Sequence, residues 1–211
     1  TAYEIRPRDW SSDVCSSDLF LLVLMQPPPA LEEEFNAWYD TEHIPERLSV
    51  PGFETALRYV CTDGAPRYLA MYDLASPGVL DSPAYLKVGF DNASPWTKRV
   101  TSRVRIYRSF GFQIYPGTAI TGRAARIQLL RFRALPSAAR DKIVAGMRAT
   151  FESRPNTLRV RVLAYDAGAG FDFLGLVEAR APMSMNSELN LDAFGEYGDA
   201  LDLVNTYVPY T

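Results

Sequence analysis

The stretch between residues 31 and 53 limits the fold of this chain more than any other part of the sequence. Four apolar residues recur there at the spacing of one helical face: Leu31, Phe35, Trp38 and Tyr39. Three glutamates at 32–34 lie in the first turn, where carboxylates favour the helix dipole. Pro45 disfavours the helical conformation of the residue before it, so the helix is expected to end near His43. Pro51 and Gly52 then predict a turn that leads into a strand.

His43 is the only histidine of the chain, and it lies at this expected helix end. Histidine is the side chain whose ordinary pKa allows proton exchange near neutral pH. A position at the C-terminal end of a helix would raise the pKa of the imidazole, because the helix dipole stabilises its charged form. Tyr39 lies one turn earlier on the same face and could be its partner in acid–base chemistry. The alternative is structural: His43 caps the last helical carbonyls and Tyr39 packs in the core.

The segment from Trp38 to Phe53 resembles the WYxxEHxPxxxxxPGF signature of the EthD-like, stress-responsive dimeric α+β barrel proteins. The resemblance continues through Arg58-Tyr59, residues 66–74 and residues 94–96, and it covers roughly residues 20–116. It implies a ferredoxin-like βαββαβ unit. It also implies a role for His43, which matches the histidine to which catalysis is attributed in decarboxylating, dehydrating and isomerising members of that family.

Residues 1–19 look unlike the rest of the chain. They correspond to a sequencing-library adapter translated in frame, and the alternative is an ordinary polar tail. They contain no apolar stretch of the kind that a signal peptide needs. We therefore leave them out of the fold prediction and expect the first folded unit to begin at Phe20.

Charge and cysteine content narrow the classes of partner. Residues 1–19 hold two of the 22 basic and four of the 25 acidic side chains, so 20 basic and 21 acidic side chains remain. This balance predicts no binding to nucleic acid and no attraction to an anionic membrane. Cys61 is the one cysteine left, which is typical of a cytoplasmic protein without disulfides. The longest apolar run, Phe20–Met25, is too short to span a bilayer.

The remaining sequence predicts two successive βαββαβ units. In the first, strands are expected at 20–26, 53–62, 67–74 and 104–115, with helices at 31–43 and in a broken stretch at 84–102. Residues 117–122 form a linker. In the second, strands are expected at 127–133, 157–165, 171–181 and 203–210, with helices at 137–153 and 189–202. The predicted fold class is α+β, with one unit at 20–117 and a second, degenerate unit at 123–211.

Each such unit has one sheet face under its helices and one bare face. Laying the two units sheet to sheet would bury both bare faces and form an intramolecular dimeric α+β barrel with a central cavity. The chain could then be a monomer with an internal pseudo-dimer, or a homodimer. Because the second unit lacks the segment around His43, the first is expected to carry any chemistry.

Five further residues are candidates for contact with a substrate: Trp38, Arg58, Cys61, Tyr72 and Trp96. Arg58 lies among apolar neighbours, so it needs an anionic ligand or, as we favour, an ion pair with Asp73. Cys61 is more typical of a small buried hydrophobe than of a nucleophile. Trp96 is more typical of the core. Alternation along a strand does not decide which face lines the cavity.

Four charged residues near His43 are expected to be solvated: Asp40, Glu42, Glu46 and Arg47. Asp40 and Glu42 could instead orient the imidazole. The sequence contains no spacing of cysteines and histidines typical of a metal site and no glycine motif typical of a nucleotide site. We therefore expect a small-molecule ligand and no cofactor.

Three functions are compatible with these features. The first is a cofactor-independent lyase or isomerase that decarboxylates, dehydrates or rearranges a small aromatic, lactone or polyketide-like carbonyl compound, with His43 as acid–base catalyst. A cofactor-free oxygenase that makes quinones is a variant of it. The second is a barrel that binds a small ligand without catalysis. The third is a haem-binding barrel with His43 as axial ligand, which rests on analogy between folds.

Overall fold

The structure, a computed structural model, describes residues 19–117, 119–182 and 189–210. Residues 1–18, which form nearly all of the adapter-like segment, lie outside the described residues. The first strand begins at Leu19, one residue before the expected start at Phe20, and Leu19 is buried. The folded unit therefore includes Leu19.

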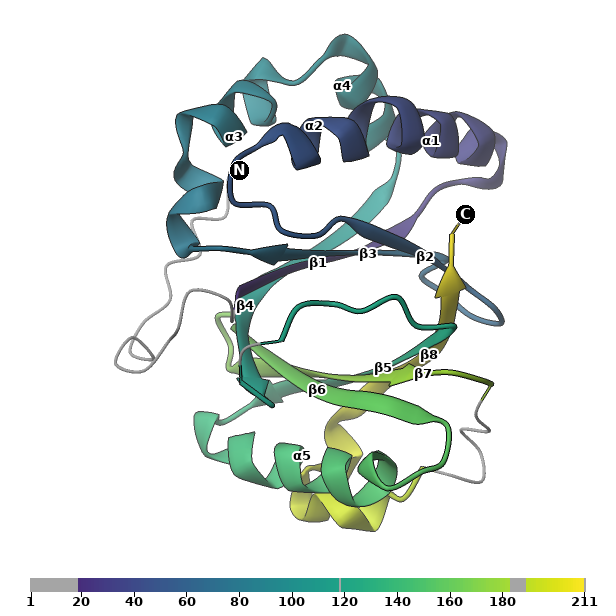
Figure 1. Ribbon diagram of the computed structural model, residues 1–211, viewed down its shortest axis with the longest axis vertical. Helices are drawn as coiled ribbons and strands as arrows, with labels where there is room; N and C mark the ends of the chain where they lie inside the picture. Colours follow the sequence, from purple (N-terminus) through teal and green to yellow (C-terminus); the bar gives the residue numbers. More distant parts are fainter. Residues whose placement is uncertain (1–18, 118, 183–188, 211) are drawn as a thin grey trace.

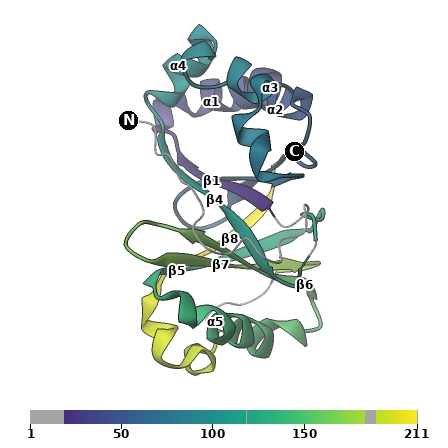
Figure 2. The same cartoon turned by 90° about the vertical axis from the view of Figure 1, so that its left-hand side faces the viewer.

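Eight antiparallel strands close into a barrel in the order β1-β3-β2-β8-β5-β7-β6-β4 (Figure 1). The strands are β1 (Leu19–Gln26), β2 (Leu57–Cys61), β3 (Tyr68–Leu74), β4 (Arg105–Tyr115), β5 (Arg126–Leu135), β6 (Thr157–Asp166), β7 (Phe171–Ala179) and β8 (Leu201–Pro209). Figure 2 shows how β4 joins the two sheet layers: it pairs with β1 in one and with β6 in the other. On the other side of the barrel, β8 joins β2 to β5.

Helices cover the outer faces of both sheet layers. The α-helices among the described residues are α1 (Glu32–Trp38), α2 (Ile44–Ser49), α3 (Pro83–Lys87), α4 (Pro95–Thr101) and α5 (Arg140–Met147). Helices α1–α4 lie over β1, β2 and β3, and α5 lies over the opposite layer (Figures 1 and 2). None of the helices in the described residues is long and apolar enough to cross a membrane.

A predicted strand and a predicted helix differ from the elements in the structure, in addition to the helix around His43 that is described with the site. The strand expected at 53–62 is shorter, because only residues 57–61 form β2. The helix expected at 189–202 is a 3-10 segment, Leu191–Ala200, with a kink at Gly195, where φ is 57° and ψ is −135°. A left-handed φ of this kind is accessible to glycine at little cost, so the glycine interrupts the helix.

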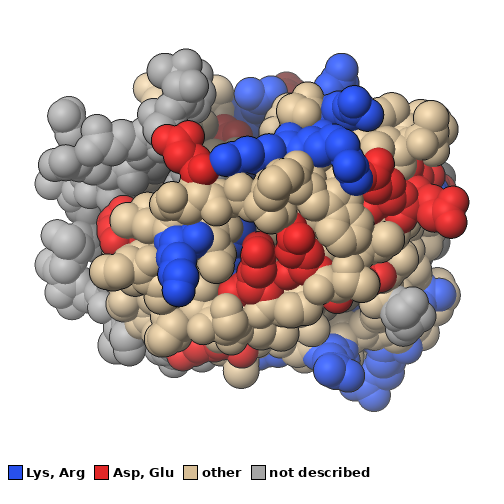
Figure 3. Space-filling view, turned by 90° about the horizontal axis from the view of Figure 1, so that it is seen from above, with Lys and Arg blue, Asp and Glu red and all other residues tan. Residues whose placement is uncertain are grey.

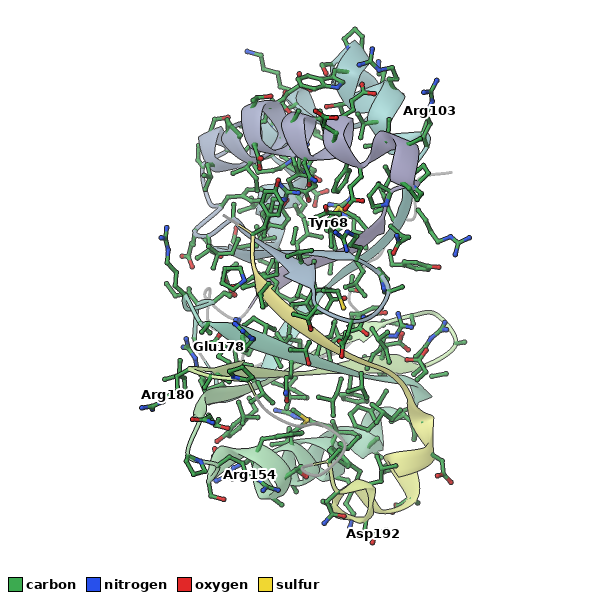
Figure 4. The ribbon with its side chains drawn as sticks, turned by 90° about the vertical axis from the view of Figure 1, so that its right-hand side faces the viewer. Tyr68, Arg103, Arg154, Glu178, Arg180 and Asp192 are labelled. Carbon is green, nitrogen blue, oxygen red and sulfur yellow. The ribbon has the colours of Figure 1, made fainter. Side chains whose placement is uncertain are left out.

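The two faces of β1 pack into different cores. Leu21, Val23 and Met25 belong to the apolar cluster under α1–α4, which also contains Tyr68 (Figure 4). Leu22 and Leu24 belong to a second cluster, inside the barrel. A strand covered on both faces needs apolar residues at every position, which explains the uninterrupted run that predicted it.

An apolar cluster lies between the two sheet layers in the part of the chain that the structure describes, and the central cavity expected from the sequence stays a prediction. Apolar side chains from both layers contribute to this cluster, together with Ala124 of the segment that joins β4 to β5. That segment runs between the two layers (Figure 1). Its Thr121 N–H donates to Asp73 Oδ2 on β3 at 2.8 Å.

One buried ion pair ties the two sheet layers and this segment together. Arg161 on β6 and Asp73 on β3 are each 1% exposed, and Arg161 Nη2 donates to Asp73 Oδ1 at 2.9 Å. Arg161 Nη1 also donates to Thr121 Oγ1 at 2.6 Å and lies 3.7 Å from Glu178 Oε1. Glu178, labelled in Figure 4, comes from β7. Arg161 Nε also donates to Gln113 Oε1 on β4, so the guanidinium has partners on three other strands and on the crossing segment.

We expect Arg161→Ala to lower the free energy of unfolding by about 3–5 kcal/mol, because it leaves the buried carboxylates of Asp73 and Glu178 without their cation. The measurement is urea unfolding. Arg148→Ala is the control, since Arg148 pairs with Glu152 on the exposed surface and such pairs contribute little. Equal losses in the two variants would contradict a central role for Arg161.

Candidate functional site

The helical segment that begins at Glu32 does not end at His43. After α1 it continues through a π-helical turn, Tyr39–His43, into α2, and Ile44 has helical φ and ψ angles of −63° and −48°. Pro45 lies in the first turn of α2, where its missing N–H is not needed. The predicted helix end was therefore wrong, because the proline begins a new helical turn rather than stopping the old one.

The π turn places His43 against two aromatic rings. Its hydrogen bond runs from the Ile44 N–H to the Tyr39 carbonyl, five residues back. Residues five apart consequently lie close together, and the centroid of the His43 ring is 4.5 Å from that of Trp38. Tyr39 meets His43 edge-on, with centroids 4.8 Å apart. The three side chains form one aromatic wall.

This wall lines a pocket of about 330 Å³ between the helices and the outer face of the sheet. Leu21, Val23 and Met25 of β1 form its apolar floor, and Tyr72 of β3 lies beside them. The size is at the lower end of the range for small-molecule pockets, about 300–1,000 Å³. His43 therefore lies on the helical side of one sheet and not between the two sheets.

The environment of His43 favours the neutral imidazole. Burial lowers its pKa well below the ordinary value of 6.5, and the positive charges of Arg47, Arg58 and Arg108 lower the pKa further. The predicted rise of the pKa was wrong, because the helix does not end at this residue and cations surround it. The buried Nδ1 atom of His43 has no hydrogen-bond partner among the described residues.

Tyr39 and Tyr72 form a pair of buried phenols in the same wall. Their hydroxyl oxygens are 3.1 Å apart. Burial raises the pKa of Tyr39 to about 12 and raises that of Tyr72 well above 10.0. Both groups therefore remain protonated at neutral pH and can offer a hydrogen bond, but neither acts as a phenolate base.

A chain of hydrogen bonds fixes Trp38. Its Nε1–H donates to Thr97 Oγ1 at 2.9 Å, and the Thr97 hydroxyl donates to Glu42 Oε1 at 2.7 Å. The hydroxyl of Ser94, which caps α4, donates to the same oxygen at 2.5 Å. Burial raises the pKa of Glu42, but these hydrogen bonds outweigh it and the net pKa is lowered. Glu42 thus joins the π turn to α4 and is not the solvated side chain that we had predicted.

Two arginines of the pocket were missed by the sequence analysis. Arg47, predicted to be a surface charge, is 6% exposed and lines the pocket with Arg108 of β4. The guanidinium of Arg47 lies 5.0 Å from the ring centroid of Tyr85, and that of Arg108 lies 5.9 Å from it. The position of Arg47 could have been predicted from its spacing: it lies four residues after His43 and therefore shares its helical face.

Three predicted contact residues lie outside the pocket. Arg58 forms an ion pair with Asp40 at 2.5 Å, not with Asp73 as predicted, and it covers the ring of Tyr39 at 4.1 Å. Cys61 belongs to the cluster inside the barrel, and burial raises the pKa of its thiol. Trp96 donates from Nε1 to Glu34 Oε1 at 3.1 Å. The structure thus brings together Trp38, Tyr39, His43 and Tyr72 of the seven predicted site residues.

The charged side chains that line the pocket are all basic, whereas the outer surface carries charges of both signs. Among the described residues, the lining of the pocket contains Arg47, Lys98 and Arg108 and no carboxylate. On the face formed by the helices above it, basic and acidic side chains are interspersed (Figure 3). No cluster of histidine, cysteine and acidic residues that could hold a metal ion occurs within the described ranges. An apolar floor, a neutral imidazole and cations together are chemically suited to a small molecule with an apolar body, and the imidazole could accept a proton from it.

Solved structures with the same fold come from several kinds of protein. An anthrone oxidase-like protein superposes with a TM-score of 0.67 at 11% identity, over 93% of this chain and 92% of that one. A chlorite dismutase variant from Candidatus Nitrospira defluvii gives 0.55 at 10% identity, over 92% of both chains. A haem-binding protein from Thermus thermophilus gives 0.51 at 10% identity, again over 92% of both.

These neighbours belong to the dimeric α+β barrel superfamily, and the likeness shows that this chain shares its fold. No protein-family model matches the chain. No curated protein matches it either. The closer resemblance to EthD-like proteins stays a prediction.

The state of His43 can be measured directly, because it is the only histidine. We expect an NMR titration of its ring protons, on protein without a histidine tag, to give a pKa well below 6.5. The unfolded chain then binds more protons than the folded one between this lowered pKa and 6.5, so stability should rise with pH across that window. His43→Gln should remove this part of the pH dependence. A titration at or above 6.5 would contradict the assigned environment.

Proposed function

We propose that the pocket binds a small aromatic or lactone-like carbonyl compound and that His43 removes a proton from it as a general base. The reaction class would be a lyase or isomerase step: decarboxylation, dehydration or rearrangement. The observation that carries the proposal is the unpartnered, buried Nδ1 of His43 in a residue that lines the pocket. A buried polar atom without a partner costs free energy, so a ligand group that bonds to it would offset that cost.

The neighbouring aromatic side chains would bind and orient the substrate. Trp38 offers an aromatic face and is fixed by its bond to Thr97. The Tyr39–Tyr72 pair can donate a hydrogen bond to a substrate oxygen that gains negative charge. His43 takes the proton from a C–H or O–H group and returns it to a different atom of the substrate or product. The step requires a neutral imidazole, which the lowered pKa supplies near neutral pH.

A barrel that binds a ligand without catalysis remains the second candidate, supported by the same pocket. The haem alternative draws support from the neighbour described as a haem-binding protein. The residues present do not fit it well. A metal-ligating histidine donates its second ring N–H to a carboxylate, carbonyl or water, whereas Nδ1 of His43 has no such partner among the described residues. The pocket of about 330 Å³ is also at the small end for a large macrocycle.

We also propose that the barrel consists of two ferredoxin-like units, with residues 20–117 carrying the site and residues 123–211 forming a degenerate partner. The strand order supports this. In the closed barrel, β4-β1-β3-β2 is followed by β8-β5-β7-β6, which is the same relative order twice. A cytoplasmic location, and the choice between a monomer and a homodimer, stay predictions.

Proton abstraction can be tested before the natural substrate is known. We would incubate the protein in D2O with 2-tetralone and related small aromatic ketones and follow loss of the α-proton signals by NMR. The wild type should exchange these protons faster than His43→Gln by at least about a hundredfold, the size of a general-base contribution. Tyr39→Phe should lose less.

Thr41→Val, a substitution on the exposed side of the π turn, is the control and should exchange like the wild type. If His43→Gln binds the ketone and exchanges its protons as fast as the wild type, His43 is not a base. The non-catalytic binding function then replaces the enzymatic one.

A further inference from the structure

We infer that the ligand of this pocket carries an anionic group, a carboxylate or a phenolate, and that Arg47 and Arg108 hold it. This inference deepens the proposed function, since it rests on the same pocket. It concerns the charge of the ligand, whereas the proposed function concerns proton transfer by His43.

Arg47 provides the first observation. Its side chain is almost fully buried, and only one of its terminal nitrogens is satisfied: Nη2 donates to the Val88 carbonyl at 3.1 Å. Nη1 is buried without a hydrogen-bond partner among the described residues, and no ion pair involves Arg47 there. A buried guanidinium without a counter-charge is strongly unfavourable unless a ligand supplies one.

Arg108 provides the second observation, from a different element. It lies opposite Val23 in the pairing of β4 with β1, so its side chain shares the face of the sheet that forms the pocket floor. Arg108 is exposed at the edge of the pocket, and its Nη2 donates to the Tyr85 hydroxyl at 2.7 Å. Tyr85 lies near both guanidiniums, so the two cations occupy the same end of the pocket.

The nearby carboxylates do not neutralise this end. Glu42 accepts hydrogen bonds from Ser94 and Thr97, and Asp40 is paired with Arg58. Glu46 follows Pro45 in α2, but it neither lines the pocket nor forms an ion pair with its neighbour Arg47 in the described chain. Neither Arg47 nor Arg108 therefore has an ion-pair partner among the described residues, and a ligand carboxylate could supply one.

The arrangement fits a ligand with an apolar body and one charged end. The body would lie on the floor of β1 beside Trp38, and the charged oxygen atoms would face the two guanidiniums. Arginine binds planar carboxylates through two parallel N–H donors, which fixes orientation as well as charge. Aromatic and lactone acids are accordingly the ligand class that we expect, ahead of neutral ketones of the same shape.

A matched pair of probes tests the charge alone. Isothermal titration calorimetry would compare 2-naphthoate with 2-naphthamide, which have nearly the same shape and differ by one negative charge. We expect the wild type to bind the carboxylate at least about tenfold more tightly, a difference of about 1.4 kcal/mol. High salt should reduce the preference, because the Arg108 end is open to solvent.

Variants assign the preference to the two arginines. Arg108→Gln and Arg47→Met should each lower the preference for the carboxylate severalfold, and Arg47→Lys should recover part of it because the charge returns. Arg105→Gln is the control, because Arg105 is exposed on the same strand but on the opposite face from Arg108. It should bind both probes like the wild type.

The outcomes separate this inference from the proposed function. Equal binding of the two probes by the wild type, or an unchanged preference in both Arg108→Gln and Arg47→Met, would overturn the anionic ligand and leave the pocket and His43 in place. If the wild type binds neither probe, the proposed function and the inference of an anionic ligand are both wrong for ligands of this size. Circular dichroism would check folding, and if Arg47→Met is unfolded, Arg108→Gln and the wild-type comparison still decide.

Discussion

The ion pair between Arg161 and Asp73 is the interaction on which the arrangement of the two sheet layers depends. The two residues come from strands that do not pair with each other, and both are buried. A buried cation must have its donors satisfied, and those of Arg161 are satisfied only when the two layers and the crossing segment at Thr121 and Ala119 are all in place. Burial of the apolar cluster inside the barrel stabilises the packing of the two layers against each other. The polar network around Arg161 fixes their relative position.

The crossing segment and an apolar cluster lie between the two layers. The pocket that His43 lines is separate from that cluster and lies on the helical side of the N-terminal layer. There the alternation of β1 gives the pocket an apolar floor, and the π turn of Tyr39–His43 contributes to its aromatic wall. An ordinary α-helix would bring residues four apart together. The extra residue of the π turn places His43 against Trp38.

The sequence predicted the elements that have a strong local pattern and missed those that depend on long-range packing. The apolar run of β1, the hairpins and the order of strands and helices follow from periodicity and turn residues. The helix end at His43 could not be predicted correctly, because the rule for the residue before a proline does not foresee a π turn. Arg47 was assigned to the surface because its burial depends on contacts with Tyr85 and Val88, at and just after α3, which lie far away in sequence.

The arginine end of the pocket and the imidazole of His43 interact electrostatically. Burial lowers the pKa of the His43 imidazole most, and the nearby arginine cations lower it further, so the base stays neutral; two of these cations, Arg47 and Arg108, would also attract an anionic ligand. Once such a ligand is bound, its negative charge offsets the cations, so the imidazole can accept a proton more easily than in the free protein. The base would thus be weak before binding and stronger afterwards. Proton transfer would then be restricted to the ligand-bound protein without a further structural element. The ligand that supplies the proton would also supply the negative charge that stabilises the protonated imidazole of His43.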